Sequence, residues 1–295
     1  MTVLSSPAVA RAPRSAVRPA PLRNRVAVFL KYLSLVLSCA VVVVPLAAVL
    51  LTSLRTSKEM ATGGALAAPH DWFNLHNYAV AFTDGNMLRA LGNTTFILVF
   101  SVTGTVLIGS MTAYAIDRFT FRFRRLVMAL FLIASLVPSV TTQVATYQIV
   151  NRLGVMDTRW APVLLYMGTD IVSIYIFLQF IRSIPISLDE AARLDGANSF
   201  TIYWRIIVPL LKPAIATVVI VKGVAIYNDF YIPFLYMPDD SLGTISTSLF
   251  RFKGPYGAHW EVISAGAALV IIPSLVVFLA LQRFIYNGFA SGATK

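Results

Sequence analysis

Six long apolar stretches, separated by short polar segments, constrain the fold of this 295-residue chain more than any other feature. Hydrophobic residues make up 57% of the sequence and charged residues only 13%, whereas a soluble domain carries about 25% charged residues. A helix needs about 20 apolar residues to cross a bilayer. The predicted spans are residues 27–52, 90–116, 126–149, 161–181, 213–236 and 262–282. We therefore expect an all-α polytopic membrane protein with six transmembrane helices.

Basic residues are shared unequally between the two faces that six spans create. They concentrate in residues 1–26, in the loops after the second and fourth spans, and at the C-terminus. The other loops balance basic against acidic residues, so the formal net charge of +11 falls on one face. Cytoplasmic loops are enriched in Lys and Arg, so we expect this face and both termini to be cytoplasmic. Residues 1–26 are also rich in Ala, Pro and Ser, a composition typical of a disordered tail.

The loop of residues 183–212 has the pattern of a helix-turn-helix at the membrane surface. Ser187 and Glu190 have the spacing of a capping box, which predicts a helix that starts at Ser187. Gly196 stands where that helix needs a left-handed residue to end. The second amphipathic run, residues 200–207, is expected to stop at Pro209 and Pro213 because proline breaks helices. Such a shape is suited to docking into another protein.

The order of residues in this loop resembles the EAA loop of importer-type ABC permeases. The matching residues are Glu190, Ala191, Ala192, Asp195, Gly196, Ile206 and Pro209. The family's usual ending, I-x-L-P, has Val208 in place of Leu here. In that family the loop is the coupling element that seats in a groove of the ATP-hydrolysing subunit. The alternative is an ordinary surface helix pair of a polytopic protein.

Outside the loop, the chain is similar to the carbohydrate-import permeases of the maltose-transporter type, which implies a permease domain over residues 27–295. Motifs that carry this resemblance are Asn77-Tyr78, Asn93-Thr94, Tyr114-Ala115 with Arg118, Asn228-Asp229-Phe230, and the ending from Gln282 to Lys295. Where Tyr227 stands, members of the family more often have Trp. None of these motifs is specific alone, but their order along the chain is.

The resemblance implies the partners of this chain. It would pair with a homologous second permease in a bacterial inner membrane, and an extracytoplasmic sugar-binding protein would deliver the cargo. ATP and magnesium would be bound by a partner ATPase dimer. This chain has no G-x-x-x-x-G-K-[ST] motif. We therefore expect a transport subunit that is not an enzyme and binds no cofactor. The three His residues lack metal-ligand spacing, and no pattern for nucleic-acid binding is present.

Charged residues inside the predicted spans are unusual because they are costly at membrane depth. Lys222 and Asp229 lie seven positions apart, on roughly one helical face of the fifth span. They are expected to line the translocation cavity, to form a structural pair, or to leave Lys222 reaching toward water. Asp170, in the fourth span, has no obvious partner in sequence. A stand-alone secondary transporter would use Asp170, Lys222 and Asp229 as its ion-coupling relay, and this is the rival interpretation.

A second group of polar side chains interrupts the apolar spans and is a candidate substrate pathway. Its members are Tyr227, Asn228, Asp229, Tyr231, Thr142 and Gln143. Sugars are bound by such mixtures of aromatic, hydroxyl and amide groups, but the same groups also bond helices to each other in membranes. Thr142 and Gln143 follow Pro138, and a kink with polar neighbours can line a cavity. Both interpretations stay open at the level of sequence.

Overall fold

The computed structural model describes residues 22–64, 66–168, 170–254 and 257–293, and the chain divides into two compact units, residues 1–48 and 49–295. In the first unit, residues 22–48 belong to α1 (Leu22–Ser53), and the side chains of residues 26–46 are exposed. Residues 1–21 of the predicted tail lie outside the described residues. Helix α1 begins at Leu22, before the predicted start of the first span at residue 27.

The second unit is helical apart from one short hairpin, as far as the structure describes it. Its α-helices after α1 are α2 (Ser57–Thr62), α3 (His76–Thr83), α4 (Met87–Arg118), α5 (Arg124–Leu136), α6 (Ser139–Arg152), α7 (Trp160–Met167), α8 (Ile171–Ser183), α9 (Ser187–Leu194), α10 (Ser199–Ile202), α11 (Val208–Leu210), α12 (Lys212–Asn228), α13 (Tyr231–Tyr236), α14 (Ile245–Ser248) and α15 (Trp260–Ala293). The remaining elements are the π-helical turn η1 (Tyr203–Ile207), the 3-10 turns η2 (Asp240–Leu242) and η3 (Leu249–Phe252), and strands β1 (Lys253–Gly254) and β2 (Gly257–Ala258), which pair antiparallel.

Two described helices are long and apolar enough to cross a membrane singly, namely α4 and the stretch Val26–Ser53 of α1. Three further pairs qualify only if each bent pair is one span: α5 with α6 at 105°, α7 with α8 at 44°, and the helical run Ser199–Leu210 with α12 at 73°. The stretch Trp260–Val276 of α15 is apolar but shorter. The count of six spans therefore stays a prediction, and several of the expected continuous spans are broken.

The breaks have local causes. Val137 precedes Pro138 and adopts an extended backbone, with ψ of 118°, because a residue before proline is disfavoured in the helical region. A new helix then begins at Ser139, so the predicted span 126–149 is divided into the two helices α5 and α6. The predicted span 213–236 is also divided, because Asp229 is extended at ψ of 122° between α12 and α13.

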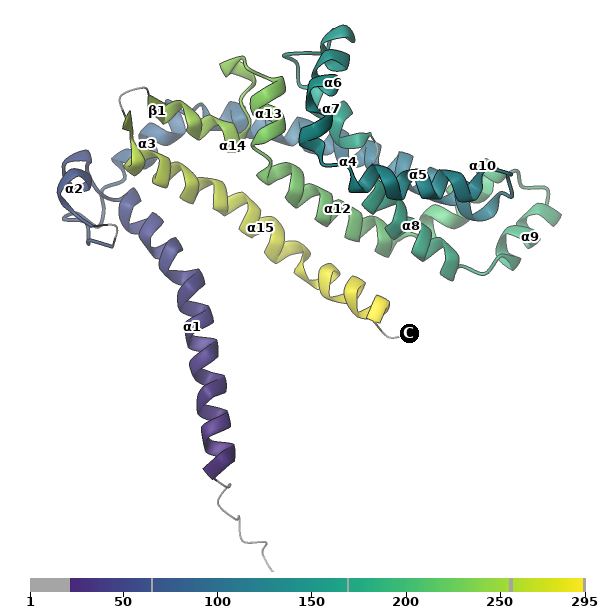
Figure 1. Cartoon of the computed structure of the whole chain (residues 1–295), viewed down its shortest axis with the longest axis horizontal. Helices are drawn as coiled ribbons and strands as arrows, with labels where there is room; N and C mark the ends of the chain where they lie inside the picture. Colours follow the sequence, from purple (N-terminus) through teal and green to yellow (C-terminus); the bar gives the residue numbers. More distant parts are fainter. Residues whose placement is uncertain (1–21, 65, 169, 255–256, 294–295) are drawn as a thin grey trace, which may run out of the picture. The chain divides into compact units, whose positions relative to one another are not determined.

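Small residues let α4 lie close to α7 and α8 (Figure 1). A Cβ atom on Gly109 would lie 3.3 Å from Cδ2 of Phe177, and one on Gly104 would lie 2.9 Å from Cβ of Met167. Close approach of this kind is how helices pack in membranes, where hydrocarbon competes for apolar contact. The packing continues into a buried cluster around Phe177, Ile181 and Ile207.

Helix α15 packs in the same way. Ala265 is fully buried, and a Cβ atom on Gly266 would collide with Cδ2 of Leu249. The small residues of the sixth predicted span thus serve packing within the fold.

Helix α4 runs along the second unit (Figure 1), and polar contacts cluster near each of its two ends. Near its start, the Asn93 amide donates to the carbonyl oxygens of Ser241 and Gly243, each at 3.1 Å. At its end, Arg118 contacts α9. At about 1.5 Å per residue, Asn93 and Arg118 lie roughly 38 Å apart along the helix. This exceeds the hydrocarbon thickness of about 30 Å, so the helix is long enough to reach both sides of a bilayer.

Candidate functional site

The first helix that the sequence predicts in this loop is present as α9, which begins at Ser187 as expected. The capping box does not form, because Ile186 is the residue that caps the helix and no side chain bonds to the free amides there. The amides of Asp189 and Glu190 donate instead to the carbonyl of Ile186, at 2.9 and 3.1 Å. Ser187 is therefore the first residue of the helix and not the capping residue that precedes it.

Gly196 ends α9 in the left-handed conformation that the sequence predicts, with φ of +83°. The amide of Ala197 donates to the carbonyl of Ala192 at 2.9 Å, and the amide of Gly196 donates to that of Arg193 at 3.0 Å. This pair of bonds is the Schellman motif, which satisfies the last carbonyls of a helix and reverses the chain. The direction in which the chain leaves α9 therefore depends on the backbone of Gly196.

The second helix of the loop does not stop at Pro209, contrary to the sequence-based expectation. The run continues from α10 through the π-helical turn η1 into α11, which ends at Leu210. Proline has no N–H to give to the carbonyl four residues earlier. The wider turn accommodates it, because the amide of Val208 bonds to the carbonyl of Tyr203, five residues back. Pro213 lies in the first turn of α12, where proline favours the start of a helix.

Two buried charges attach α9 to α4. Nε of Arg118 lies 2.8 Å from Oδ2 of Asp189, and both side chains are almost fully buried. An Nη2 proton of Arg118 is also donated to the carbonyl of Ile184, at 2.8 Å. Arg118 further pairs with Asp117 at 2.9 Å, and Asp117 in turn lies 3.7 Å from Arg124 and 3.6 Å from Arg182. The base of the loop is thus held by charge as well as by packing.

The opposite face of α9 is open. Glu190, Ala191, Asp195 and Gly196 are exposed, and Ala192 is half-buried. The predicted residues of the second helix divide in the same way, since Pro209 is exposed and Ile206 is half-buried against the core.

Leu194 is 90% exposed on α9. Its exposure and the burial of Asp189 were not predicted, although helical spacing carries the signal. Glu190 and Leu194 are four residues apart and share one face, while Asp189 and Ala192 share the other.

Lys222 pairs with Asp170 and not with Asp229. Nζ of Lys222 lies 3.2 Å from Oδ1 of Asp170, and the hydroxyl of Ser173 also donates to Asp170. The structural pair of Lys222 and Asp229, one of the alternatives considered from the sequence, does not form. Helix α12 ends at Asn228. Asp229 no longer follows the helical face. Asp170, for which the sequence offered no partner, thus joins the start of α8 to α12.

Asp229 instead accepts a hydrogen bond from the Tyr166 hydroxyl at 2.8 Å, and its other oxygen accepts the amide of Tyr231 at 2.7 Å. The hydroxyl of Tyr227 donates to the carbonyl of Val270 on α15, at 2.7 Å. Asn228 bonds within its own helix, to the carbonyl of Val224 at 2.9 Å.

The remaining candidates of the substrate pathway lie in two places. Tyr231 is 48% exposed on α13. Thr142 and Gln143 lie on α6, where Thr142 is exposed and Gln143 is half-buried. For Tyr227, Asn228 and Asp229 the contacts within and between helices are present, while a role toward substrate stays a prediction.

Comparison with known proteins gives consistent matches. The family described as "Binding-protein-dependent transport system inner membrane component" matches residues 105–290. The melibiose/raffinose/stachyose import permease protein MelC of Bacillus subtilis is 29% identical over 89% of this chain and 95% of that protein. The galactooligosaccharides transport system permease protein GanQ of Bacillus subtilis is 33% identical over 69% of this chain and 72% of that protein. Among solved structures, a bacterial ABC transporter involved in the import of the acidic polysaccharide alginate matches with a TM-score of 0.77 at 20% identity, over 93% of this chain and 99% of that chain.

Proposed function

This chain belongs to the family of binding-protein-dependent transport system inner membrane components, and from that premise we propose that its cargo is a sugar or an oligosaccharide. It is a permease subunit of an ABC importer, and it is a transport subunit rather than an enzyme. The cargo is inferred from relatives that are named for melibiose, raffinose, stachyose and galactooligosaccharides. The membrane face that carries the net charge of +11 is the cytoplasmic face in this proposal.

The observation that carries the coupling role is the two-sided character of α9. One face is attached to α4 through the ion pair of Arg118 and Asp189, and the other leaves Glu190 and Leu194 open. A helix that is fixed at its base and exposed at its tip can transmit a movement of its partner to the membrane helices. We assign this face to the ATPase subunit, which binds ATP and magnesium. A second permease completes the pore, and a sugar-binding protein docks at the other end of α4.

Reconstitution tests the proposal directly. The chain is purified with the proteins that accompany it, placed in proteoliposomes with the sugar-binding protein, and supplied with labelled oligosaccharide. Uptake that requires ATP on the side of the membrane where the ATPase lies supports the importer. Uptake that follows an ion gradient without ATP would instead favour the secondary transporter that uses Asp170, Lys222 and Asp229. If no sugar is taken up but another solute is imported with ATP, the proposal of a sugar cargo is refuted and the importer stands.

Sidedness is tested with two cysteines of matched exposure in a Cys39→Ala background. Leu194 is 90% exposed on α9 and Phe73 is 88% exposed in the loop before α3. In intact cells that express the chain without the ATPase, an impermeant thiol reagent should label Phe73→Cys and leave Leu194→Cys unlabelled. Both should react after permeabilisation. Labelling of position 194 in intact cells would contradict the proposed orientation.

A further inference from the structure

A cavity of about 240 Å³ lies between α13 and the turns η2 and η3, at the end of α4 opposite to α9. The phenyl rings of Phe234 and Phe250 form one of its walls, 5.3 Å apart between centroids and edge to face. The two rings are 48% and 44% exposed, so each keeps part of its surface open to a ligand, although Phe230 stacks on Phe234 and Nζ of Lys253 lies 5.5 Å from the centroid of the Phe250 ring. Asp239, Asp240 and Arg251 also line the cavity.

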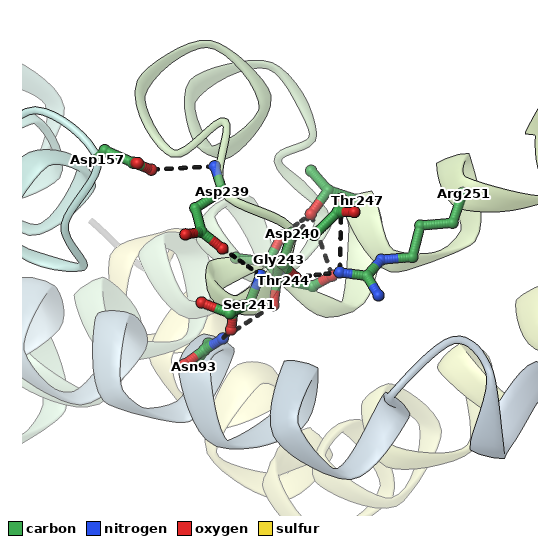
Figure 2. Close-up of polar contacts among 9 residues, drawn as sticks. All are labelled: Asn93, Asp157, Asp239, Asp240, Ser241, Gly243, Thr244, Thr247 and Arg251. Atoms are coloured by element: carbon green, nitrogen blue, oxygen red, sulfur yellow. Dashed lines mark hydrogen bonds and ion pairs between the residues drawn. The ribbon is translucent and has the colours of Figure 1, made fainter.

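The cavity is built on α4 rather than on a free loop (Figure 2). The Asn93 amide, from a residue only 5% exposed, donates to the carbonyls of Ser241 and Gly243. The hydroxyl of Thr94, on the same helix, accepts the amide of Ile245 at 3.0 Å. On the other side, Asp157 accepts the amide of Asp239 at 3.0 Å (Figure 2). A site that is held in place before binding loses less entropy when the ligand arrives.

The charged groups of the lining retain capacity for hydrogen bonds. Arg251 contacts Asp240 through Nη2, but a guanidinium has five N–H donors in a planar fork. Asp240 is 84% exposed as a side chain. Oδ1 of Asp239 accepts the amide of Ser241 at 2.6 Å, and this bond holds the pKa of Asp239 below its usual range. Asp239 is therefore a carboxylate at neutral pH, with Oδ2 as a further acceptor.

We propose that this cavity binds one neutral pyranose unit of the cargo as it enters the permease. A pyranose has an apolar C–H face that stacks on aromatic rings and a rim of hydroxyls that bond to carboxylates and guanidinium groups. Binding pockets of drug-sized ligands span about 300–1,000 Å³, so a smaller cavity suits a single ring. Asp239 and Asp240 are balanced by Arg251 and by Lys253 at the Phe250 ring, so no net charge draws a sugar acid to the cavity.

This inference rests on the proposed sugar cargo, and its test separates the two. Saturation-transfer NMR is recorded on the purified transporter without the binding protein, with D-glucose, D-galactose and D-glucuronate as probes. We expect transfer to a neutral sugar and less to glucuronate. Phe250→Leu, which removes the ring, should weaken binding about fivefold, since aromatic contacts contribute on the order of 1 kcal/mol. Phe250→Tyr keeps the ring and should retain binding.

Phe100 supplies the matched control, because it is also 44% exposed but lies on α4, outside the cavity lining. Phe100→Leu should leave saturation transfer unchanged. Equal signals in wild type and Phe250→Leu, or equal losses in Phe250→Leu and Phe100→Leu, would overturn the site.

The two proposals can fail separately. If wild type imports sugar with ATP but shows no transfer, the cavity proposal fails and the cargo stands. If Phe250→Leu then lowers only the affinity for the binding protein, the cavity is a docking surface. If wild type imports no sugar and shows no transfer, both proposals fail.

Discussion

Arg118 and Asp189 form an ion pair of 2.8 Å that joins the last residue of α4 to the buried face of α9. Their side chains are 4% and 3% exposed, so water screens the pair little. The two residues differ in their ion-pair partners. Arg118 also pairs with Asp117, whereas Asp189 has Arg118 as its only ion-pair partner among the described residues.

This asymmetry predicts unequal effects of mutating the two residues. Arg118→Met leaves the Asp189 carboxylate buried without a counter-charge, and breaking a buried pair in this way destabilises by about 3–5 kcal/mol. Asp189→Asn should be milder, because Asp117 still balances Arg118. The double change Arg118→Met with Asp189→Asn should recover part of the loss. Thermal unfolding of the purified chain and retention of the ATPase measure both effects; a milder Arg118→Met would contradict the asymmetry.

The pair of Asp170 and Lys222 predicts which charge in the membrane helices matters most. Asp170→Asn leaves Lys222 without its partner at 3.2 Å, and an uncompensated charge at membrane depth costs about 2.5–3.5 kcal/mol on insertion scales. Lys222→Met in the same chain should restore much of the yield of folded protein, measured by fluorescence-detected size exclusion.

Asp229→Asn is the matched control for that experiment. The Tyr166 hydroxyl that donates to Asp229 at 2.8 Å can donate to an amide oxygen as well. The yield should therefore fall less than in Asp170→Asn. An equal or larger loss in Asp229→Asn would contradict the greater importance of the pair of Asp170 and Lys222.

The hydrogen bonds of Glu59 predict that the local stability of the segment between α1 and α3 depends on pH. Backbone hydrogen bonds from Thr56 and then from His70, at 2.6 and 2.8 Å, lower its pKa to about 2. A depressed carboxylate pKa means that its stabilising effect is complete above the ordinary value of 4.5 and is lost as pH falls through about 2. Protection factors of the Thr56 and His70 amides, from hydrogen exchange, should hold from neutral pH to about 4 and then decline. Glu59→Gln keeps one acceptor oxygen in place of two, so at least one of the two amides should be less protected at neutral pH and acid should change the protection little; unchanged protection of both would refute the role of Glu59.

The parts of this structure that follow from the sequence depend on local patterns. Hydropathy locates α4 within a few residues because a membrane helix has a fixed length, and Gly196 marks the end of α9 because few residues adopt positive φ. Relations that depend on tertiary packing are not found in this way. The partner of Lys222 lies on another helix, and the break at Asp229 removes the spacing from which a pair within one helix was considered. The attachment of α9 likewise depends on Arg118, a distant residue that the sequence places in a motif at the end of the second span without indicating its partner.

The coupling role is tested most directly at Gly196. Its φ of +83° is strained for any residue with a Cβ atom, while the space around an added Cβ is empty. The effect of a substitution therefore comes from the backbone alone, at about 1–2 kcal/mol for a left-handed residue. Gly196→Val should break the bonds from Gly196 and Ala197 to the last turn of α9 and redirect the chain. Gly196→Asn is the matched control, since Asn tolerates this conformation.

We expect both variants to insert into the membrane in normal amounts, because the membrane helices are untouched. Gly196→Val should then show sharply reduced sugar uptake and weaker co-purification of the ATPase, and Gly196→Asn should stay near wild type. Glu190→Lys, which reverses an exposed charge on the open face without altering the turn, should reduce ATPase association independently. If Gly196→Val and Glu190→Lys both retain wild-type uptake and ATPase binding, α9 is not the coupling element. In that case the ion pair of Arg118 and Asp189 has only a structural role.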